Sequence, residues 1–356
     1  MSIIETGFRV ANIIIGVDTH KSTHVAVAIN QQGARLAAIS VPANSKGYME
    51  LNNWSRSLGS VQAYGIEGTG SYGAGLSRYL LSLGLNVIEV TRPNRQLRYQ
   101  QGKNDSLDAE GAARSVLSGQ AIAAPKTQLG SVEMIRHLKI ARDTAVKSRS
   151  VSMVTLKTLI INAPAELRDG IDQIKGKIAL IRYIAAFRPG PITSTTASAK
   201  AAMRSLARRW LMLNDEIAEL DKELKALVEA KAPSLMASHG IATLTIAEML
   251  ILVGDNPGRI RSEAALAKLC GVCPIPASSG KTHRFRLNRG GNRQANAALY
   301  RVVIVRMRNH EPTLAYVRKR TKDGKSKSEI IRCLKRYIVR EIFTHLCRSE
   351  TLKNSC

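Results

Sequence analysis

The stretch Ile13-Ile14-Ile15-Gly16-Val17-Asp18 decides the fold, because its β-branched residues predict a buried strand that ends on a carboxylate. A second run, Val61-Gln62-Ala63-Tyr64-Gly65-Ile66-Glu67, has the same form. A carboxylate at the end of a buried strand is unfavourable unless it is paired or bound to a metal ion. Asp18 and Glu67 are therefore candidate site residues.

Two further acids, Asp105 and Asp108, lie three residues apart at the start of a predicted helix, which puts both on one helix face. Each acid alone has a structural explanation, since an aspartate that opens a helix is more often an N-cap than a ligand. Together the four acids predict a site for Mg²⁺, with Mn²⁺ as an alternative, because hard cations prefer a few carboxylate oxygens with water and phosphate.

The first 118 residues alternate between strand and helix patterns in the order β-β-β-α-β-α-β-α. The predicted strands are residues 13–18, 24–29, 35–41, 61–67 and 86–91, and the predicted helices are residues 45–58, 73–83 and 105–117. A three-stranded meander followed by two helix-linked strands fits the ribonuclease H-like (RuvC-like) α/β fold, with a mixed sheet and helices on its faces. In that fold the last helix carries Asp105 and Asp108 over Asp18 and Glu67.

The middle of the chain is predicted to be helical at residues 131–162 and 198–230. Apolar residues in the second helix follow alternating steps of three and four, a heptad seam of Met203, Leu206, Trp210, Leu213, Ile217, Leu220, Leu224 and Leu227. The seam fits either packing against the 131–162 helix of the same subunit or an intermolecular coiled coil. We expect three domains: a catalytic domain at 1–125, a helical coiled-coil spacer and assembly region at 126–234, and a mainly α, strongly basic domain at 235–356.

The charge of the chain predicts a nucleic-acid partner. Its 356 residues include 53 Lys and Arg against 27 Asp and Glu, a formal charge of +26 that favours polyanions. Residues 1–118 hold 11 basic and 8 acidic side chains, whereas residues 279–356 hold 20 and 5. We therefore expect DNA as the partner and a mostly C-terminal phosphate-binding surface. Aromatic residues make up only 4%, which argues against base stacking on a large aromatic platform.

A serine pair, Ser278 and Ser279, lies in a glycine-containing loop beside basic residues. The candidate nucleic-acid contacts there are Lys281, Arg284, Arg286, Arg289, Asn292 and Arg293. Serine in such a loop usually serves the turn, and a nucleophilic role is the alternative.

Cys270 and Cys273 have the spacing of half a zinc site or of a redox pair. No second such pair accompanies them, and small buried thiols explain them adequately. The odd number of five cysteines does not suggest a disulfide framework. No apolar run approaches the ~18 residues of a spanning helix, and the N-terminus lacks the layout of a signal peptide. We expect a cytoplasmic bacterial protein, nucleoid-associated when active, with no membrane partner.

Nearly the whole chain resembles the insertion-sequence transposases numbered one hundred and ten, DEDD-type recombinases that include the pilin-gene invertase and the bridge-RNA-guided recombinases. The first three acidic stretches are similar to the family's motifs: Gly16-Val17-Asp18-Thr19-His20-Lys21, Glu67-Gly68-Thr69-Gly70-Ser71-Tyr72 and Lys103-Asn104-Asp105-Ser106-Leu107-Asp108-Ala109. Ser278-Ser279-Gly280 matches the serine motif, and Arg289-Gly290-Gly291-Asn292 resembles the basic-Gly-Asn signature. One departure is Ala242, which stands where the family often has a second glycine.

The resemblance implies a DNA transposase or site-specific recombinase. In it, Asp18, Glu67, Asp105 and Asp108 would hold Mg²⁺ while Ser279, or Ser278 as the fallback, attacks a DNA phosphate and forms a phosphoserine-linked strand. It also implies guidance by a structured, element-encoded bridge RNA and assembly as a homodimer or homotetramer.

Two other function classes stay open. One is a RuvC-type, Mg²⁺-dependent junction nuclease in which the four acids activate water as the nucleophile. The other is a non-catalytic nucleic-acid-binding protein in which the acids are structural.

Overall fold

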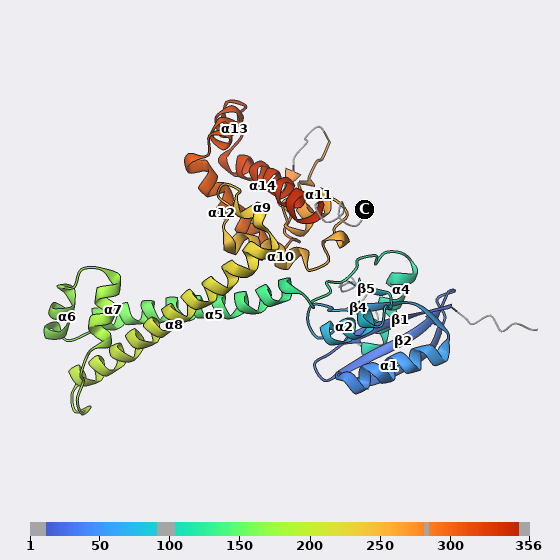
Figure 1. Cartoon of the computed structure of the whole chain (residues 1–356), viewed down its shortest axis with the longest axis horizontal. Helices are drawn as coiled ribbons and strands as arrows, with labels where there is room; N and C mark the ends of the chain where they lie inside the picture. Colours follow the sequence, from blue (N-terminus) through green and yellow to red (C-terminus); the bar gives the residue numbers. More distant parts are fainter. Residues whose placement is uncertain (1–11, 91–103, 281–284, 349–356) are drawn as a thin grey trace, which may run out of the picture. The chain divides into compact units, whose positions relative to one another are not determined.

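The computed structural model describes residues 12–90, 104–280 and 285–348, and the chain divides into two compact units. The first comprises Met1–Gly130, Val253–Leu269 and Leu346–Cys356, and the second comprises Ser131–Leu252 and Cys270–His345. Figure 1 colours them along the sequence. No helix in the described ranges is long and apolar enough to cross a membrane.

The first unit is built on a five-stranded mixed sheet in the order β3-β2-β1-β4-β5. Its strands are β1 (Asn12–Thr19), β2 (Thr23–Asn30), β3 (Arg35–Pro42), β4 (Ser60–Glu67) and β5 (Val87–Val90). The first three form an antiparallel meander, and β4 and β5 add in parallel to β1. The helices are α1 (Ser45–Leu58), α2 (Ala74–Ser82) and α4 (Asp105–Leu117). The predicted strand and helix order is therefore confirmed for the described residues.

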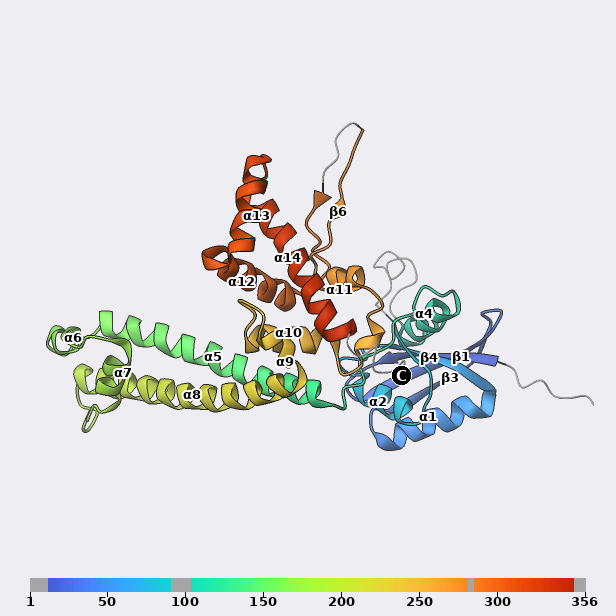
Figure 2. The same ribbon diagram turned by 45° about the horizontal axis from the view of Figure 1, so that its top comes forward.

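Each face of the sheet is covered by different helices, as Figure 2 shows. Because side chains alternate along a strand, Ile13, Ile15 and Val17 enter one core together with Leu51 of α1 and Leu76 of α2. On the other face, residues such as Ile14 pack against Ala109 and Ala113 of α4. The same alternation places Asp18 on the α4 face, two pleats beyond Ile14.

Two glycines let α4 lie directly on the sheet. Gly16 of β1 and Gly65 of β4 are registered neighbours in the parallel pair. A Cβ at Gly16 would collide with the Ala109 carbonyl oxygen, and one at Gly65 would approach the Val116 side chain to 2.7 Å. The absence of these two Cβ atoms therefore sets the height of α4 above the ends of β1 and β4.

The segment Val253–Leu269 completes the first unit with a 3₁₀ turn (η1, Pro257–Arg259) and the short helix α11 (Glu263–Leu269). The Asn256 side-chain amide donates to the Pro125 carbonyl at 2.9 Å. The Gly130 amide donates to the Asp255 carboxylate at 3.2 Å. These bonds attach the segment to the end of the N-terminal region.

The second unit is mainly helical. Its elements are α5 (Ser131–Ile161), α6 (Ala165–Asp172), α7 (Lys177–Ala185), α8 (Thr195–Lys231), α9 (Pro233–Met236), α10 (Thr243–Val253), β6 (Ile275–Pro276), β7 (Phe285–Arg286), α12 (Arg293–Asn309), α13 (Glu311–Lys322) and α14 (Lys327–Phe343). A π-helical turn (η2, Thr344–Arg348) follows α14, and its last residues belong to the first unit. The long helices α5 and α8 run side by side in both views (Figures 1 and 2). Between them, Pro164 and Gly176 occupy the N-cap positions of α6 and α7, so these residues start helices in a stretch for which the sequence predicted none.

The apolar stripe of α8 drifts away from the predicted heptad seam. Met203, Trp210, Leu213, Ile217 and Leu224 are buried as expected, but Ala207 and Val228 are buried in place of Leu206 and Leu227. A straight α-helix repeats every 3.6 residues, so a stripe that follows it departs from a strict 3.5-residue seam. The stripe packs against α5 of the same chain, where Leu156 joins Met203 and Trp210 in one cluster and Ala145 joins Leu213 in another.

Candidate active site

Asp18 and Glu67 lie at the same end of two neighbouring parallel strands. Each comes directly after the last registered pair, Val17 with Ile66, so the sequence prediction of their placement is confirmed. Both are buried, with 7% and 5% of their surface exposed. The Thr19 hydroxyl donates to the Glu67 backbone carbonyl at 2.9 Å, which fixes the ends of the two strands to each other.

Helix α4 brings the second pair of acids to the sheet. Asp105 and Asp108 occupy its first turn, and the preceding Asn104 caps the helix by accepting from the Ser106 amide at 3.0 Å. The N-cap role that was one explanation of Asp105 thus belongs to Asn104. Asp105 is left to project toward the sheet, where it meets Asp18 through an intermediate histidine.

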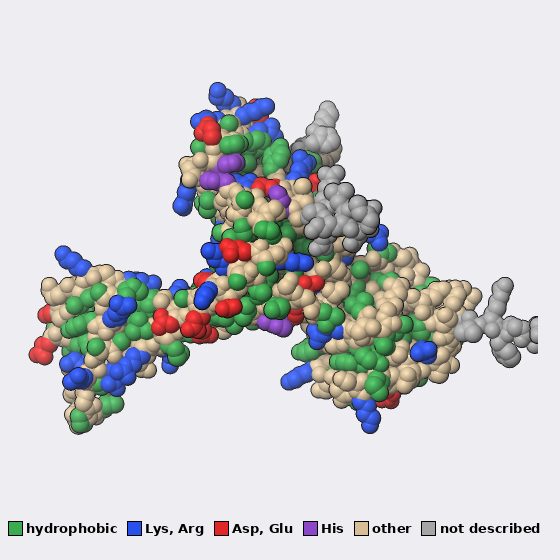
Figure 3. All heavy atoms as spheres, in the orientation of Figure 1, with side chains coloured by type: hydrophobic (Ala, Val, Ile, Leu, Met, Phe, Trp, Pro, Cys, Tyr) green, Lys and Arg blue, Asp and Glu red, His purple; other side chains and the backbone are tan. Residues whose placement is uncertain are grey.

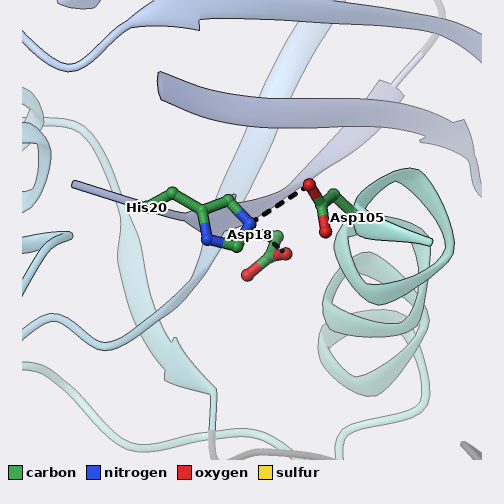
Figure 4. A group of neighbouring side chains, drawn as sticks. All are labelled: Asp18, His20 and Asp105. Atoms are coloured by element: carbon green, nitrogen blue, oxygen red, sulfur yellow. Dashed lines mark ion pairs between the residues drawn. The ribbon is translucent and has the colours of Figure 1, made fainter. Parts of the chain in front are cut away.

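That histidine is His20, which the sequence reasoning did not select. Its Nε2 atom lies 3.1 Å from a carboxylate oxygen of Asp18 and 3.3 Å from one of Asp105 (Figure 4). His20 is two residues beyond Asp18, and side chains two positions apart along an extended chain point to the same face. This spacing is the signal in the sequence that would have found it.

The electrostatics of Asp18 reflect this crowding. Burial raises the pKa of the Asp18 carboxyl above its usual range, and His20 opposes the rise. The neighbouring carboxylates of Asp108 and Asp105 raise the pKa further. Asp18, Asp105 and Asp108 are thus close enough to repel one another, an arrangement that a bound cation stabilises.

The donor atoms fit a divalent metal ion. One ligand atom each from Asp18, His20 and Asp105 lie within 4.8 Å of one another. Two carboxylates and an imidazole suit several divalent ions, with carboxylates favouring Mg²⁺ or Mn²⁺ and the imidazole favouring transition metals. The structure therefore contains a candidate metal site that includes two of the four predicted acids, Asp18 and Asp105, with His20 as a third ligand. Among the described residues, Glu67 and Asp108 are not part of this group of ligand atoms.

The serine pair belongs to the second unit. Ser278 and Ser279 are exposed in the hairpin between β6 and β7, which pair antiparallel in the register Ile275 with Arg286. Gly280 follows with a φ of +53°, in the left-handed region that glycine favours. The exposed hydroxyls of Ser278 and Ser279 are sterically accessible to a large substrate.

The six predicted nucleic-acid contacts do not all have the same place in the structure. Lys281 and Arg284 lie outside the described residues. Arg286, Arg289 and Arg293 are exposed, as a phosphate-binding role requires. Asn292 has a structural function, since its side chain caps α12 by accepting from the Ala295 amide at 2.9 Å.

The two cysteines form no metal cluster in the described part of the chain, and both are free thiols. Cys270 is fully buried, and burial raises its pKa to about 12. Its backbone lies directly against Gly291, where any Cβ would collide with Gly271. The Asn296 amide donates to the carbonyls of Cys270 and Gly271 at 2.9 and 3.1 Å. The expectation of small buried thiols holds for Cys270, whereas Cys273 is only half-buried. The close backbone packing explains Gly271 and Gly291.

Comparison with known families covers both units. Residues 15–161 match a transposase family model of the DEDD IS110 type, and residues 232–318 match the model described as "Transposase IS116/IS110/IS902 family". The first match contains all four acids, and the second contains Ser278 and Ser279.

Three individual relatives are proteins of insertion elements from Streptomyces and Mycobacterium. The chain is 27% identical to the uncharacterized 43.6 kDa protein of element IS110 from Streptomyces coelicolor, over 42% of this chain and 38% of that protein. It is 22% identical to the 44.8 kDa protein of IS116 from Streptomyces clavuligerus, over 88% and 89% of the two chains. It is also 22% identical to the 42 kDa protein of IS900 from Mycobacterium paratuberculosis, over 90% and 92%. The chain belongs to the IS116/IS110/IS902 family of transposases.

Proposed function

We propose that the chain is a DNA transposase or site-specific recombinase that cleaves and rejoins DNA through a phosphoserine intermediate. The observation that carries this proposal is the cluster of Asp18, His20 and Asp105 beneath the first turn of α4. A chain of formal charge +26 is suited to binding the phosphates of nucleic acid. A compact acidic site within it supports a chemical reaction at those phosphates in addition to binding. The mixed sheet that carries it fits a RuvC-like domain.

The four acids, Asp18, Glu67, Asp105 and Asp108, would hold Mg²⁺ or Mn²⁺. Such an ion supplies positive charge to phosphate oxygens. Ser279, with Ser278 as the fallback, contributes the nucleophile. Its Oγ forms a bond to the DNA phosphorus, the bond from that phosphorus to one sugar oxygen breaks, and the departing sugar oxygen receives a proton. A carboxylate of the acidic cluster can accept the serine proton and pass it on. One phosphate ester replaces another, so the strand can be rejoined without ATP.

The same proposal includes partners and assembly. We infer that the basic C-terminal domain, residues 235–356, contacts DNA backbones, and that a structured guide RNA from the element selects the sites. The helical region 126–234 would act as spacer and assembly device. Several apolar side chains on α5 support a subunit contact there, because Val151, Val154 and Ile161 are 65%, 66% and 69% exposed. The protein would work in the bacterial cytoplasm at the nucleoid.

The test is a covalent-adduct assay. The full chain would be incubated with Mg²⁺, labelled element-end DNA and the flanking transcript, and a denaturing gel would separate protein-linked from free DNA. We expect a linked band in the wild type and in Ser278→Ala, and its loss in Ser279→Ala and in Asp18→Asn. Loss in Ser278→Ala alone would move the nucleophile by one residue.

The hydrolytic nuclease predicts a different gel. Free nicked ends without a linked band, persisting in both serine variants and lost in Asp18→Asn, would establish water as the nucleophile. Full cleavage by Asp18→Asn would contradict both the serine mechanism and the water mechanism.

A further inference from the structure

A cavity of about 800 Å³ lies within the second unit, beside the hairpin that carries Ser279. Its wall is formed by Phe285 and Arg286 of the hairpin, by the loop that starts at Gly271, and by side chains of α13 and α14. The volume falls in the range of small-ligand sites, ~300–1,000 Å³, and is too small for a double helix. Figure 3 shows Lys and Arg side chains gathered over α13, at the top of this view.

The cavity is strongly cationic. Its lining includes seven Lys and Arg side chains, and Glu329 is the one acidic residue among the described lining residues. The Glu329 carboxylate is already engaged as part of the α14 capping box, where it accepts from the Ser326 amide and hydroxyl at 2.9 and 2.8 Å. Among the described lining residues, cationic side chains therefore outnumber acidic ones by seven to one.

Lys335 is the most buried of these cations. It is 9% exposed. The ammonium donates to the Asn296 side-chain carbonyl at 2.7 Å and lies 5.3 Å from the centre of the Tyr300 ring. Burial lowers the pKa of Lys335, and the charge of Arg332 lowers it further. A cation held at such a position is stabilised when an anion enters.

Aromatic rings border the same space, although the chain is poor in aromatics. Tyr337 is 50% exposed and Phe285 is 64% exposed. Tyr337 packs edge-on against Tyr316 with ring centres 5.4 Å apart, and the Arg340 guanidinium lies 5.6 Å from the centre of the Tyr337 ring. Exposed ring faces beside guanidinium groups are the elements that bind single-stranded nucleic acid, by stacking and by phosphate contacts.

We propose that this cavity binds one unpaired nucleotide of a nucleic-acid strand, with its phosphate on Arg332, Arg336 and Lys335 and its base against Tyr337. Because the Ser279 hairpin forms one wall, the captured nucleotide would belong to a strand that passes the serine. The inference rests on the proposed function in one respect, that the ligand is nucleic acid. Pockets that take up an unstacked base and contact it by stacking are known from enzymes that act on nucleobases.

The test measures binding of the full chain to a short fluorescein-labelled single-stranded DNA and to the duplex of the same sequence. The cavity variant is Arg332→Gln with Arg336→Gln. Its matched control is Arg301→Gln with Arg308→Gln, which removes the same charge from exposed positions of α12 outside the cavity. We expect the cavity variant to lose about tenfold or more in single-strand affinity and the control to lose much less. The salt slope of the cavity variant should fall by about 0.7, the effect of losing one phosphate contact on a single strand.

A strand containing 2-aminopurine reports on stacking. We expect its fluorescence to change on binding to the wild type and not on binding to Tyr337→Leu, which should also lose about tenfold in affinity. Equal losses for the cavity and control pairs would overturn the proposal in favour of general surface charge. Adenosine monophosphate that binds as tightly as the strand and displaces it would overturn it in favour of a free nucleotide.

The failure of this inference is distinguishable from failure of the serine mechanism. A covalent adduct that persists without cavity-dependent strand binding removes the cavity proposal alone. Cavity-dependent strand binding by a wild-type chain that forms no covalent adduct removes the serine mechanism alone.

Discussion

Gly16 of β1 and Ala109 of α4 meet backbone to backbone, with no room for a side chain between them. Asp18 lies two residues beyond Gly16 on the same face of the sheet, and Asp105 lies one helical turn before Ala109. The contact therefore sets the separation between the two carboxylates that meet at His20. A residue without a side chain thus controls the geometry of the acidic site.

Gly16→Ala is predicted to displace α4. The added Cβ collides with backbone atoms, which cannot move as a flexible side chain can, so the helix must shift outward and leave packing defects against Ile14. We expect a loss of about 1–3 kcal/mol in the free energy of unfolding. Urea denaturation checks the stability, and metal titration by thermal shift checks the site. We expect the metal-induced rise in Tm to disappear.

Gly111→Ala is the matched control on the same helix. Gly111 lies within α4, and a Cβ there meets nothing within 4 Å. Alanine in a helix interior is favoured over glycine by roughly 0.5–1 kcal/mol, so this variant should be more stable than the wild type and should still respond to metal. A Gly16→Ala variant as stable as Gly111→Ala would show that α4 is not held by this contact.

The positions of the acids could be predicted because each depends on local pattern. A β-branched run ending in Asp18, a second ending in Glu67 and two aspartates at helical spacing fix both the elements and their order. Parallel neighbours bring their carboxyl ends to one edge, and that step needs only topology. The sequence predicted this half of the site because no long-range packing detail enters the argument.

Other features depend on packing that the pattern does not encode. Arg306 resembles its basic neighbours in sequence, yet it points inward, whereas Arg301 and Arg308 are exposed. The cavity around Lys335 is assembled from α12, α14 and the serine hairpin, three elements whose packing against one another no local pattern specifies. The α8 stripe, which drifts off the heptad, packs against α5 of the same chain.

Asp18→Asn is predicted to stabilise the metal-free protein while removing its response to metal. Burial raises the pKa of Asp18, so ionisation is less favourable in the folded chain than in the unfolded one. Below the ordinary pKa of 3.8 the carboxyl is protonated in both states. As pH rises through the raised pKa of Asp18, the wild type loses folding stability, whereas Asp18→Asn, whose side chain stays neutral, does not. In EDTA, the Tm of Asp18→Asn should therefore exceed that of the wild type near pH 7, with the gap closing toward pH 4.

Metal binding is predicted to reverse the order of stability of the wild type and Asp18→Asn. At a concentration of ~100 times its Kd, Mg²⁺ or Mn²⁺ should stabilise the wild type by about 2.7 kcal/mol and leave Asp18→Asn unchanged. Asp169→Asn, at an exposed position of α6, controls for the loss of one negative charge. An Asp18→Asn protein that is less stable than the wild type in EDTA would mean that the carboxylate makes structural bonds that the amide cannot replace.

His20→Ala is predicted to weaken metal binding without abolishing it. The imidazole bridges Asp18 and Asp105, so its loss removes either a ligand or the group that orients two carboxylates. Changes of this kind cost about 10–100-fold in metal affinity. Isothermal titration with Mn²⁺ measures the effect, and His137→Ala, whose side chain is 64% exposed on α5, is the control. Unaltered Mn²⁺ affinity in His20→Ala would place the metal on the acids alone.

Arg306→Gln is predicted to destabilise the second unit by about 2 kcal/mol. The Arg306 guanidinium binds both oxygens of Glu341, at 2.9 and 3.0 Å, and donates to the His239 carbonyl at 2.7 Å. Breaking a fully buried pair costs ~3–5 kcal/mol, but the Glu341 side chain is 29% exposed, so water recovers part of the loss. Arg308→Gln, exposed in the same turn of α12, should change stability by less than ~0.5 kcal/mol.

The pH dependence of the Arg306 effect has a definite sign. Burial opposes ionisation of Glu341, but hydrogen bonds from Arg306 and Ser238 outweigh it and lower the pKa of the carboxyl below 4.5. The stability that Glu341 contributes is therefore complete above pH 4.5 and is lost as pH falls through its lowered pKa. Urea denaturation at pH 7 and near pH 4 should show the gap between wild type and Arg306→Gln shrinking on acidification. A gap that is constant across this range would assign the stabilisation to the bond with His239 instead of the ion pair.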